Sequence, residues 1–184
     1  MPSKTQQNIK RIVQVGLLIA LAVVVRNFSV MLPIAGVSGL RISFGEAFTK
    51  IAAILFGPLY GGISSGSLDV IGFFLAGGAF GPYIPWITVD AVLGGTMTGL
   101  LWILAGKINK KWRIHDEFLK ILIVTGIPSL IVSTLDSIVL SKTYSAYFLL
   151  MWIPRILEQV LMIVIQAYII TYLISIYKKY LVKT

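Results

Sequence analysis

The stretch Gly81-Pro82-Tyr83-Ile84-Pro85-Trp86-Ile87-Thr88-Val89-Asp90-Ala91-Val92-Leu93-Gly94-Gly95 joins a proline-stiffened aromatic loop to an apolar segment that carries a carboxylate. Proline lacks a backbone N–H and biases the residue before it away from helix, so the stretch predicts a helix that begins at Pro85 or Trp86. Asp90 then falls just inside the apolar zone. Two interpretations fit: the mouth of a binding site, or an aromatic belt at a membrane surface with a capping acid.

The composition indicates an integral membrane protein of one domain. Of the 184 residues, 57% are hydrophobic and only 12% are charged, whereas about a quarter are charged in a typical soluble domain. The mean hydropathy is +0.90. The chain has no cysteine, which excludes disulfides and thiolate chemistry.

Six segments are apolar and long enough to cross a bilayer, or to lie within a bundle that does. They cover residues 9–30, 46–60, 61–78, 86–106, 119–140 and 147–177. Basic residues gather before the first segment, between the fourth and fifth, and at the end of the chain. The positive-inside rule therefore predicts an all-α protein with six transmembrane helices, both termini cytoplasmic, and a long outer loop at 31–45. A basic face on anionic lipid accounts for the net charge of +9 without any nucleic acid.

Two features of the first half of the chain have two interpretations each, and a third predicts a turn. The loop 31–45 is either a lid over a site or a passive surface loop. Gly16 and Ala20 form a small-residue face on the first helix, either for another membrane helix or for packing inside the bundle. Phe56-Gly57-Pro58 predicts a tight turn, since glycine accepts unusual dihedral angles and proline suits the first position of a helix.

Charged side chains inside a bilayer cost several kcal/mol, so each is a candidate functional group or half of a pair. Glu46 and Lys50 have the spacing of a helical ion pair. Asp69 either binds a ligand or accepts hydrogen bonds from a neighbouring helix, with Lys50 as one possible partner. Arg26 and Arg41 lie toward the outer side.

A second group of charges falls in the outer halves of the last three helices, with aromatic residues nearby. It predicts an outward-facing cavity with aromatic walls and a few oriented charges, as small-molecule sites have. The alternative is an internal lattice of ion pairs, for instance Asp136 with Arg155. The group consists of Tyr83, Trp86, Asp90, Asp136, Tyr147, Trp152, Arg155 and Glu158.

The chain shows no constellation for catalysis. Its only histidine, His115, lies in a predicted cytoplasmic loop, and no glycine-rich nucleotide loop is present. We therefore expect no enzyme activity, no catalytic residue, no cofactor and no metal site.

The architecture and several motifs together resemble the substrate-binding S component of an energy-coupling-factor (ECF) vitamin transporter, with the folate type closest. Six short helices and a long first outer loop are part of this resemblance. The motifs are Arg41-Ile42-Ser43-Phe44-Gly45, Ile54-Leu55-Phe56-Gly57-Pro58-Leu59-Tyr60-Gly61-Gly62, Leu68-Asp69-Val70-Ile71-Gly72 and Tyr83-Ile84-Pro85-Trp86-Ile87-Thr88.

The resemblance implies a subunit of the prokaryotic plasma membrane that binds a vitamin at its outer face. It implies partners as well: a transmembrane coupling protein, docked on Gly16 and Ala20, and two cytoplasmic ATPases. The loop 31–45 takes the role of a lid. Folate-type members commonly have Pro-Gly-Phe-Thr at residues 85–88, so Trp86 is a departure that leaves another vitamin open.

For a folate, the chemistry of the ligand assigns roles to the candidate residues. Asp90 or Asp136 would accept the N–H groups of the pterin ring, and Trp86 or Trp152 would stack on it. The glutamate tail would meet one of three arginines, namely Arg26, Arg41 or Arg155. A helical membrane scaffold without a ligand is the alternative to this function.

Overall fold

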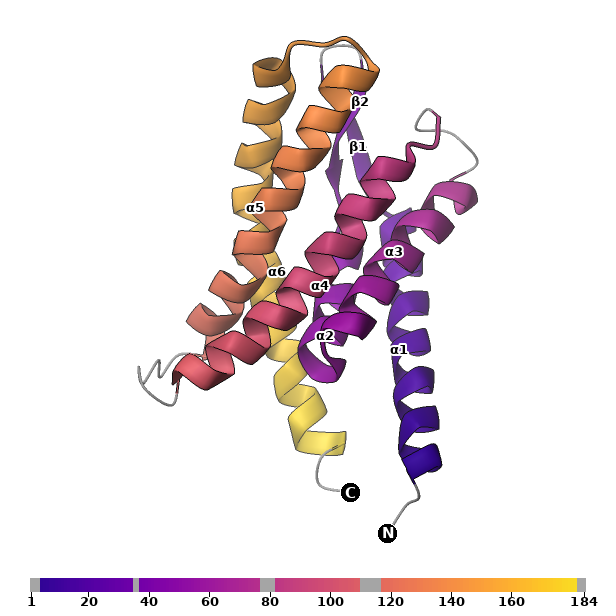
Figure 1. The fold of residues 1–184 in the computed structure, drawn as a ribbon, viewed down its shortest axis with the longest axis vertical. Coiled ribbons are helices and arrows are strands. Elements are labelled where there is room, and N and C mark those ends of the chain that lie inside the picture. The colour runs from indigo at the N-terminus through magenta and orange to yellow at the C-terminus, as the bar shows by residue number, and fades with distance from the viewer. Residues whose placement is uncertain (1–3, 35–36, 77–81, 110–116, 182–184) are drawn as a thin grey trace.

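The described residues form six helices, with a two-stranded hairpin between the first and the second (Figure 1). The computed structural model describes residues 4–34, 37–76, 82–109 and 117–181, without the side chains of 4, 30–34, 37–41, 108, 109, 178, 180 and 181. The predicted set of six helices is confirmed. The elements are α1 (Lys4–Asn27), β1 (Val30–Ile34), β2 (Val37–Ile42), α2 (Gly45–Phe56), α3 (Pro58–Leu75), α4 (Pro85–Asn109), α5 (Glu117–Thr143) and α6 (Phe148–Leu181).

The segment 31–45, predicted as a loop of an all-α protein, contains a two-stranded hairpin. Strands β1 and β2 pair antiparallel from Val30 opposite Ile42 to Ile34 opposite Val37. The ladder is irregular between Leu32 and Pro33, because proline has no N–H to donate. The prolines and glycines of this segment predicted an irregular loop, and the pairing of two short apolar runs was missed.

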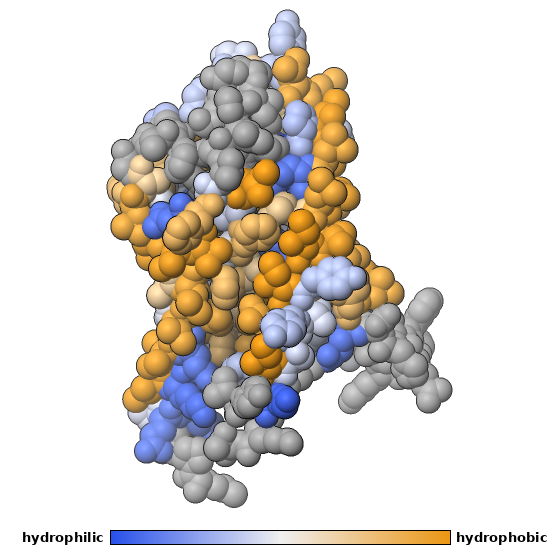
Figure 2. Space-filling model, turned by 180° about the vertical axis from the view of Figure 1, so that it is seen from behind, coloured by the Kyte–Doolittle hydropathy of each residue, from blue (hydrophilic) through white to orange (hydrophobic). Residues whose placement is uncertain are grey.

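The molecule is a multi-pass membrane protein. Helices α1, α4, α5 and α6 are each long and apolar enough to cross a bilayer. Figure 2 shows hydrophobic residues over much of one face, and a hydrophilic cluster at the end where α1 begins. The start of α1 and the end of α6 lie at the same end of the bundle (Figure 1), as an even number of crossings requires. Which side is cytoplasmic stays a prediction.

Helix α2 packs inside the bundle and is too short to span the hydrocarbon core by itself. Its 12 residues extend about 18 Å, at 1.5 Å per residue, against a hydrocarbon core of about 30 Å. Its apolar face joins a core with α5 and α6 that includes Ile51, Ile121 and Ile170. An embedded helix can carry charged residues because the surrounding helices shield them from lipid.

Glycine and proline set the joints between α2, α3 and α4 as the sequence predicts. Gly57 has φ 99° and ψ 179°, and Pro58 opens α3. Helix α4 begins at Pro85. A Cβ on Gly61 would lie 2.5 Å from the Cβ of Ala53 and 2.5 Å from the carbonyl oxygen of Gly95, so the three helices pack at backbone distance there.

Candidate ligand-binding site

A cavity of about 240 Å³ lies between the helices, and all six contribute to its wall. Its lining is mixed, with carboxylates, basic groups, hydroxyls and apolar side chains facing one space. Charged groups are costly at membrane depth, so their concentration around this cavity makes it the candidate ligand-binding site. The charged lining residues are Arg26, Glu46, Lys50, Asp69, Asp136, Arg155 and Glu158.

One wall of the cavity is a hydrogen-bonded network centred on Asp69. The Arg26 guanidinium donates from Nη2 to Asp69 Oδ1 at 2.9 Å and from Nη1 to the Leu68 carbonyl at 3.1 Å. The Thr88 hydroxyl donates to Asp69 Oδ2 at 2.7 Å, and the Tyr83 hydroxyl lies 2.6 Å from Thr88 Oγ1. Because the Thr88 hydroxyl donates its proton to Asp69, the Tyr83 hydroxyl is the donor in the hydrogen bond between Tyr83 and Thr88.

Gly72 makes this arrangement possible. A Cβ there would lie 2.7 Å from both Cδ and Nε of Arg26, so any larger residue would push the guanidinium aside. Asp69 accepts hydrogen bonds from neighbouring helices, as one of its two interpretations predicted, but its ion-pair partner is Arg26 of α1 and not Lys50. The pair is largely buried, with 15% and 13% of the two side chains exposed, so the two charges hold α1 and α3 together.

The opposite wall is built from α5 and α6. Arg155 Nη2 lies 3.2 Å from Asp136 Oδ2, which is the ion pair that the alternative interpretation of this group named. Glu158 and Gln159 follow one turn later on α6, and both line the cavity. Asp136 Oδ1 and Gln159 Nε2 are buried and have no hydrogen-bond partner among the described residues.

A third group of polar residues joins α2 to α6. Lys50 is 8% exposed; its Nζ lies 3.6 Å from Glu46 Oε2 and also donates to the Gln166 side-chain oxygen. The amide nitrogen of Gln166 donates to the Ser43 carbonyl, just after β2. The predicted pair of Glu46 and Lys50 is confirmed, and this contact ties the base of the hairpin to the helices around the cavity.

Of the nine residues predicted to bind a ligand, the structure brings five to the cavity wall. These are Arg26, Tyr83, Asp136, Arg155 and Glu158. Asp90 is 8% exposed and lies beside Asp136 but is not part of the lining, and its Oδ2 has no partner in the described chain. The side chain of Arg41 lies outside the described residues. Gly16 and Ala20, predicted for docking, are both exposed on α1.

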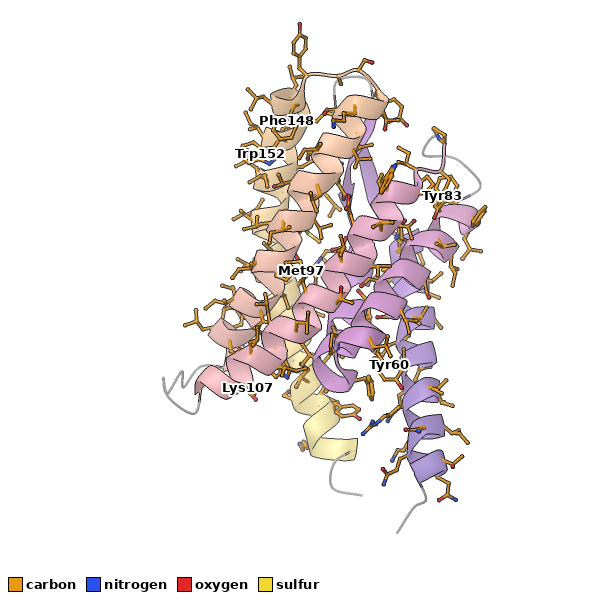
Figure 3. The ribbon with its side chains drawn as sticks, viewed as in Figure 1. Tyr60, Tyr83, Met97, Lys107, Phe148 and Trp152 are labelled. Carbon is orange, nitrogen blue, oxygen red and sulfur yellow. The ribbon has the colours of Figure 1, made fainter. Side chains whose placement is uncertain are left out.

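The two tryptophans expected to stack on a ligand do not line the cavity. Trp86 is 67% exposed. Trp152 donates from Nε1 to Thr134 Oγ1 at 3.2 Å and stacks on Phe148, and Figure 3 shows this pair on the α5–α6 side, away from Tyr83. The cavity face of α4 runs through Ile87 and Ala91, about 100° around the helix from Trp86.

Several lining residues were missed as ligand contacts by the sequence analysis. Lys50 was interpreted only as half of a structural pair, and Gln159 and Tyr144 were not considered. Gln159 could have been identified from the sequence, because it is a polar side chain inside a long apolar segment. Hydroxyl residues such as Ser133 give no such signal, because they often bond to their own helix backbone.

Comparisons with known proteins agree on one family. The family model described as "ECF-type riboflavin transporter, S component" matches residues 6–179. The "Folate transporter FolT" of Clostridium novyi (strain NT) is 26% identical over 159 residues, which are 86% of this chain and 84% of that protein.

Two solved structures have a similar fold. A crystal structure of FolT bound with folic acid matches with a TM-score of 0.67 and 26% identity, and covers 89% of this chain and 92% of the other. The S component for biotin from an ECF-type ABC transporter matches with a TM-score of 0.70 and 18% identity, over 95% of each chain. The second likeness concerns the fold alone.

Proposed function

The chain belongs to the family of S components of ECF-type transporters. We therefore propose that it binds folate or a closely related vitamin for import. The family consists of transport subunits and not of enzymes. Support for folate comes from the FolT relative and from the FolT structure with folic acid, each 26% identical over most of the chain.

The observation that carries the proposal is the cavity with guanidinium groups on two facing walls. Folate combines a flat pterin ring, rich in N–H donors, with a tail that bears two carboxylates. Carboxylates on the wall suit the ring, the Tyr83 ring suits stacking, and Arg26 or Arg155 suits the tail, since guanidinium groups bind carboxylates in paired hydrogen bonds.

We place this subunit in a prokaryotic plasma membrane, with a transmembrane coupling protein and two cytoplasmic ATPases as partners. Membership of the family supports this assembly. The exposed face of α1 suits the coupling protein, because a Cβ added to Gly16 would meet nothing within 4 Å. Close approach of another helix needs such a surface.

Riboflavin is the second candidate ligand, because the matching family model is described by that vitamin. Riboflavin carries no charge, so it would leave the arginines of the cavity in their present ion pairs. A folate tail would instead compete with Asp69 or Asp136 for a guanidinium group.

Thermal unfolding of the detergent-purified protein tests the proposal with folic acid, riboflavin and biotin. A ligand at 1,000 times its Kd stabilises the folded state by about 4 kcal/mol, which raises the melting temperature by several degrees. We expect this shift with folic acid. A shift with riboflavin alone would identify the other vitamin, and no shift with any of the three would favour the helical scaffold without a ligand.

A further inference from the structure

The charged residues of the cavity wall form three ion pairs and leave one carboxylate over. Arg26 pairs with Asp69, Arg155 with Asp136, and Lys50 with Glu46. The seventh charged lining residue, Glu158, has no ion pair or hydrogen bond among the residues that the structure describes. A carboxylate at membrane depth without a partner is costly, so the presence of Glu158 in the cavity wall points to a partner from outside the chain.

The neighbours of Glu158 do not remove this imbalance. Lys50 and Arg155 attract the carboxylate at longer range, and Glu46 repels it. Both basic groups are already engaged, Lys50 with Glu46 and Gln166, and Arg155 with Asp136. Each of these basic groups therefore divides its attraction between its own partner and Glu158. Neither of them donates a hydrogen bond to the Glu158 oxygens.

The next residue on α6 has unsatisfied bonding capacity as well. Gln159 also lines the cavity, and its amide nitrogen is buried without a partner among the described residues. Buried polar atoms are nearly always hydrogen-bonded, and an unpaired one costs about 1–3 kcal/mol. The terminal torsion of a glutamine is soft, so this amide can turn to either a donor or an acceptor on a ligand.

We propose that Glu158 determines which ligand is bound by accepting hydrogen bonds from an N–H edge of its ring, with the Gln159 amide beside it. The ligand class is a heterocycle in which ring N–H and amino groups lie side by side, or an N–H lies beside a carbonyl. This proposal rests on the proposed function, and it assigns the ring to Glu158 in place of Asp90 or Asp136. Asp136 keeps its bond to Arg155.

The test compares Glu158→Gln with Glu117→Gln in the purified full-length protein. Glu117 lies exposed in the first turn of α5 and is not part of the cavity lining. We expect Glu158→Gln to lower the affinity for folic acid about 10- to 100-fold, because hydrogen bonds to a charged group are among the strongest. Glu117→Gln should change the affinity less than about 3-fold.

The melting temperature of the ligand-free protein gives a second measurement. Removal of a partly buried charge without a partner in the described chain should raise it in Glu158→Gln, so affinity falls while stability rises. A purely structural role predicts the reverse, a lower melting temperature with unchanged affinity. That result would overturn the proposal.

The 2-deamino analogue of folic acid tests the contact itself, because it lacks the exocyclic amino donor. It should bind the wild type more weakly than folic acid and should bind Glu158→Gln about as well as folic acid does. An equal loss in both proteins would place the amino group elsewhere and contradict the assignment.

The proposed function and this inference fail in different ways. If folic acid binds but Glu158→Gln binds it equally well, the inference is wrong and the function stands. If only riboflavin binds, and Glu158→Gln lowers the affinity for riboflavin, whose ring has an N–H beside a carbonyl, the inference stands without folate. If the wild type binds none of the ring vitamins, both are overturned.

Discussion

Arg26, in the last turn of α1, joins this helix to the cavity wall. Its guanidinium bonds to Asp69 and to the Leu68 carbonyl, and Asp69 in turn accepts the Thr88 hydroxyl. Tyr83 is bonded to Thr88 and packs on Phe73 with ring centroids 5.1 Å apart. The Tyr83 ring is thus held in place without a ligand, and under the proposed function this would lower the entropic cost of binding.

Tyr83 and Trp86 give a matched test at this scale, since both are aromatic residues of one short stretch. Tyr83→Leu should lower the affinity for folic acid about 10-fold, because an aromatic contact contributes about 0.5–1.5 kcal/mol beyond its buried area. Trp86→Leu should leave the affinity unchanged, since Trp86 is 67% exposed and lies outside the lining. Isothermal titration calorimetry measures both.

Tyr83→Phe is the control for the hydroxyl, because it keeps the ring and loses only the bond to Thr88. An effect of Trp86→Leu as large as that of Tyr83→Leu would return Trp86 to the binding site.

Helices α2 and α3 are the elements that bring polar groups to membrane depth. They meet at Gly57, where the chain reverses, and α2 is too short to cross the bilayer alone. Lys50 on α2 and Asp69 on α3 both face the cavity. The position of both therefore depends on a single turn.

The backbone conformation of Gly57 leads to a prediction about the stability of the protein. Gly57→Ala should destabilise the protein by about 1–3 kcal/mol, because φ 99° with ψ 179° is a conformation that only glycine adopts without strain. A Cβ there would meet no other atom within 4 Å, so the cost comes from the backbone and not from a clash. Thermal unfolding in detergent measures it.

Gly106→Ala is the matched control for the turn. Its Cβ would also meet nothing within 4 Å, but the residue lies inside α4, where alanine is favoured by up to about 1 kcal/mol. It should leave stability unchanged or raise it slightly. Equal destabilisation by both substitutions would show that backbone conformation at Gly57 is not the cause.

At the scale of the whole molecule, the protein has an apolar exterior and a charged interior. Large hydrophobic residues such as Leu17 and Leu161 are more than 60% exposed, and the paired charges surround the cavity. Most of the exterior therefore suits lipid. The small residues Gly16 and Ala20 on α1 form the part of this surface that suits a partner helix.

Gly16→Leu combined with Ala20→Leu should abolish vitamin uptake by cells that contain the complete transporter, while the purified subunit binds folic acid as before. Bulk on this face blocks close approach of the coupling protein and touches nothing inside the subunit at Gly16. Uptake of radiolabelled folic acid and titration of the purified variant are the two measurements.

Val160→Leu combined with Val164→Leu adds bulk to an exposed face of α6 at the same helical spacing, with 49% and 42% of the two residues exposed. Uptake should persist in this control. Uptake that also persists in the α1 variant would mean that the coupling protein docks elsewhere.

The sequence alone determined the features that depend on local physics. Prolines and a glycine placed the turn at Gly57 and the start of α4 at Pro85, and the hydropathy gave six helices and a membrane location. The pair of Glu46 and Lys50 also followed from helical spacing. Each of these rests on residues a few positions apart, so no knowledge of packing was needed.

Only the tertiary structure decided that Arg26 meets Asp69 and that Glu158 remains without a partner among the described residues. Arg26 and Asp69 are 43 positions apart, and Lys50 and Gln166 are 116 apart. The rotation of each helix about its axis selects the side chains that reach the cavity, and a shift of one residue turns a side chain by about 100°. Packing sets that rotation, which is why Trp86 lies outside the cavity and Glu158 lines it without a partner in the described chain.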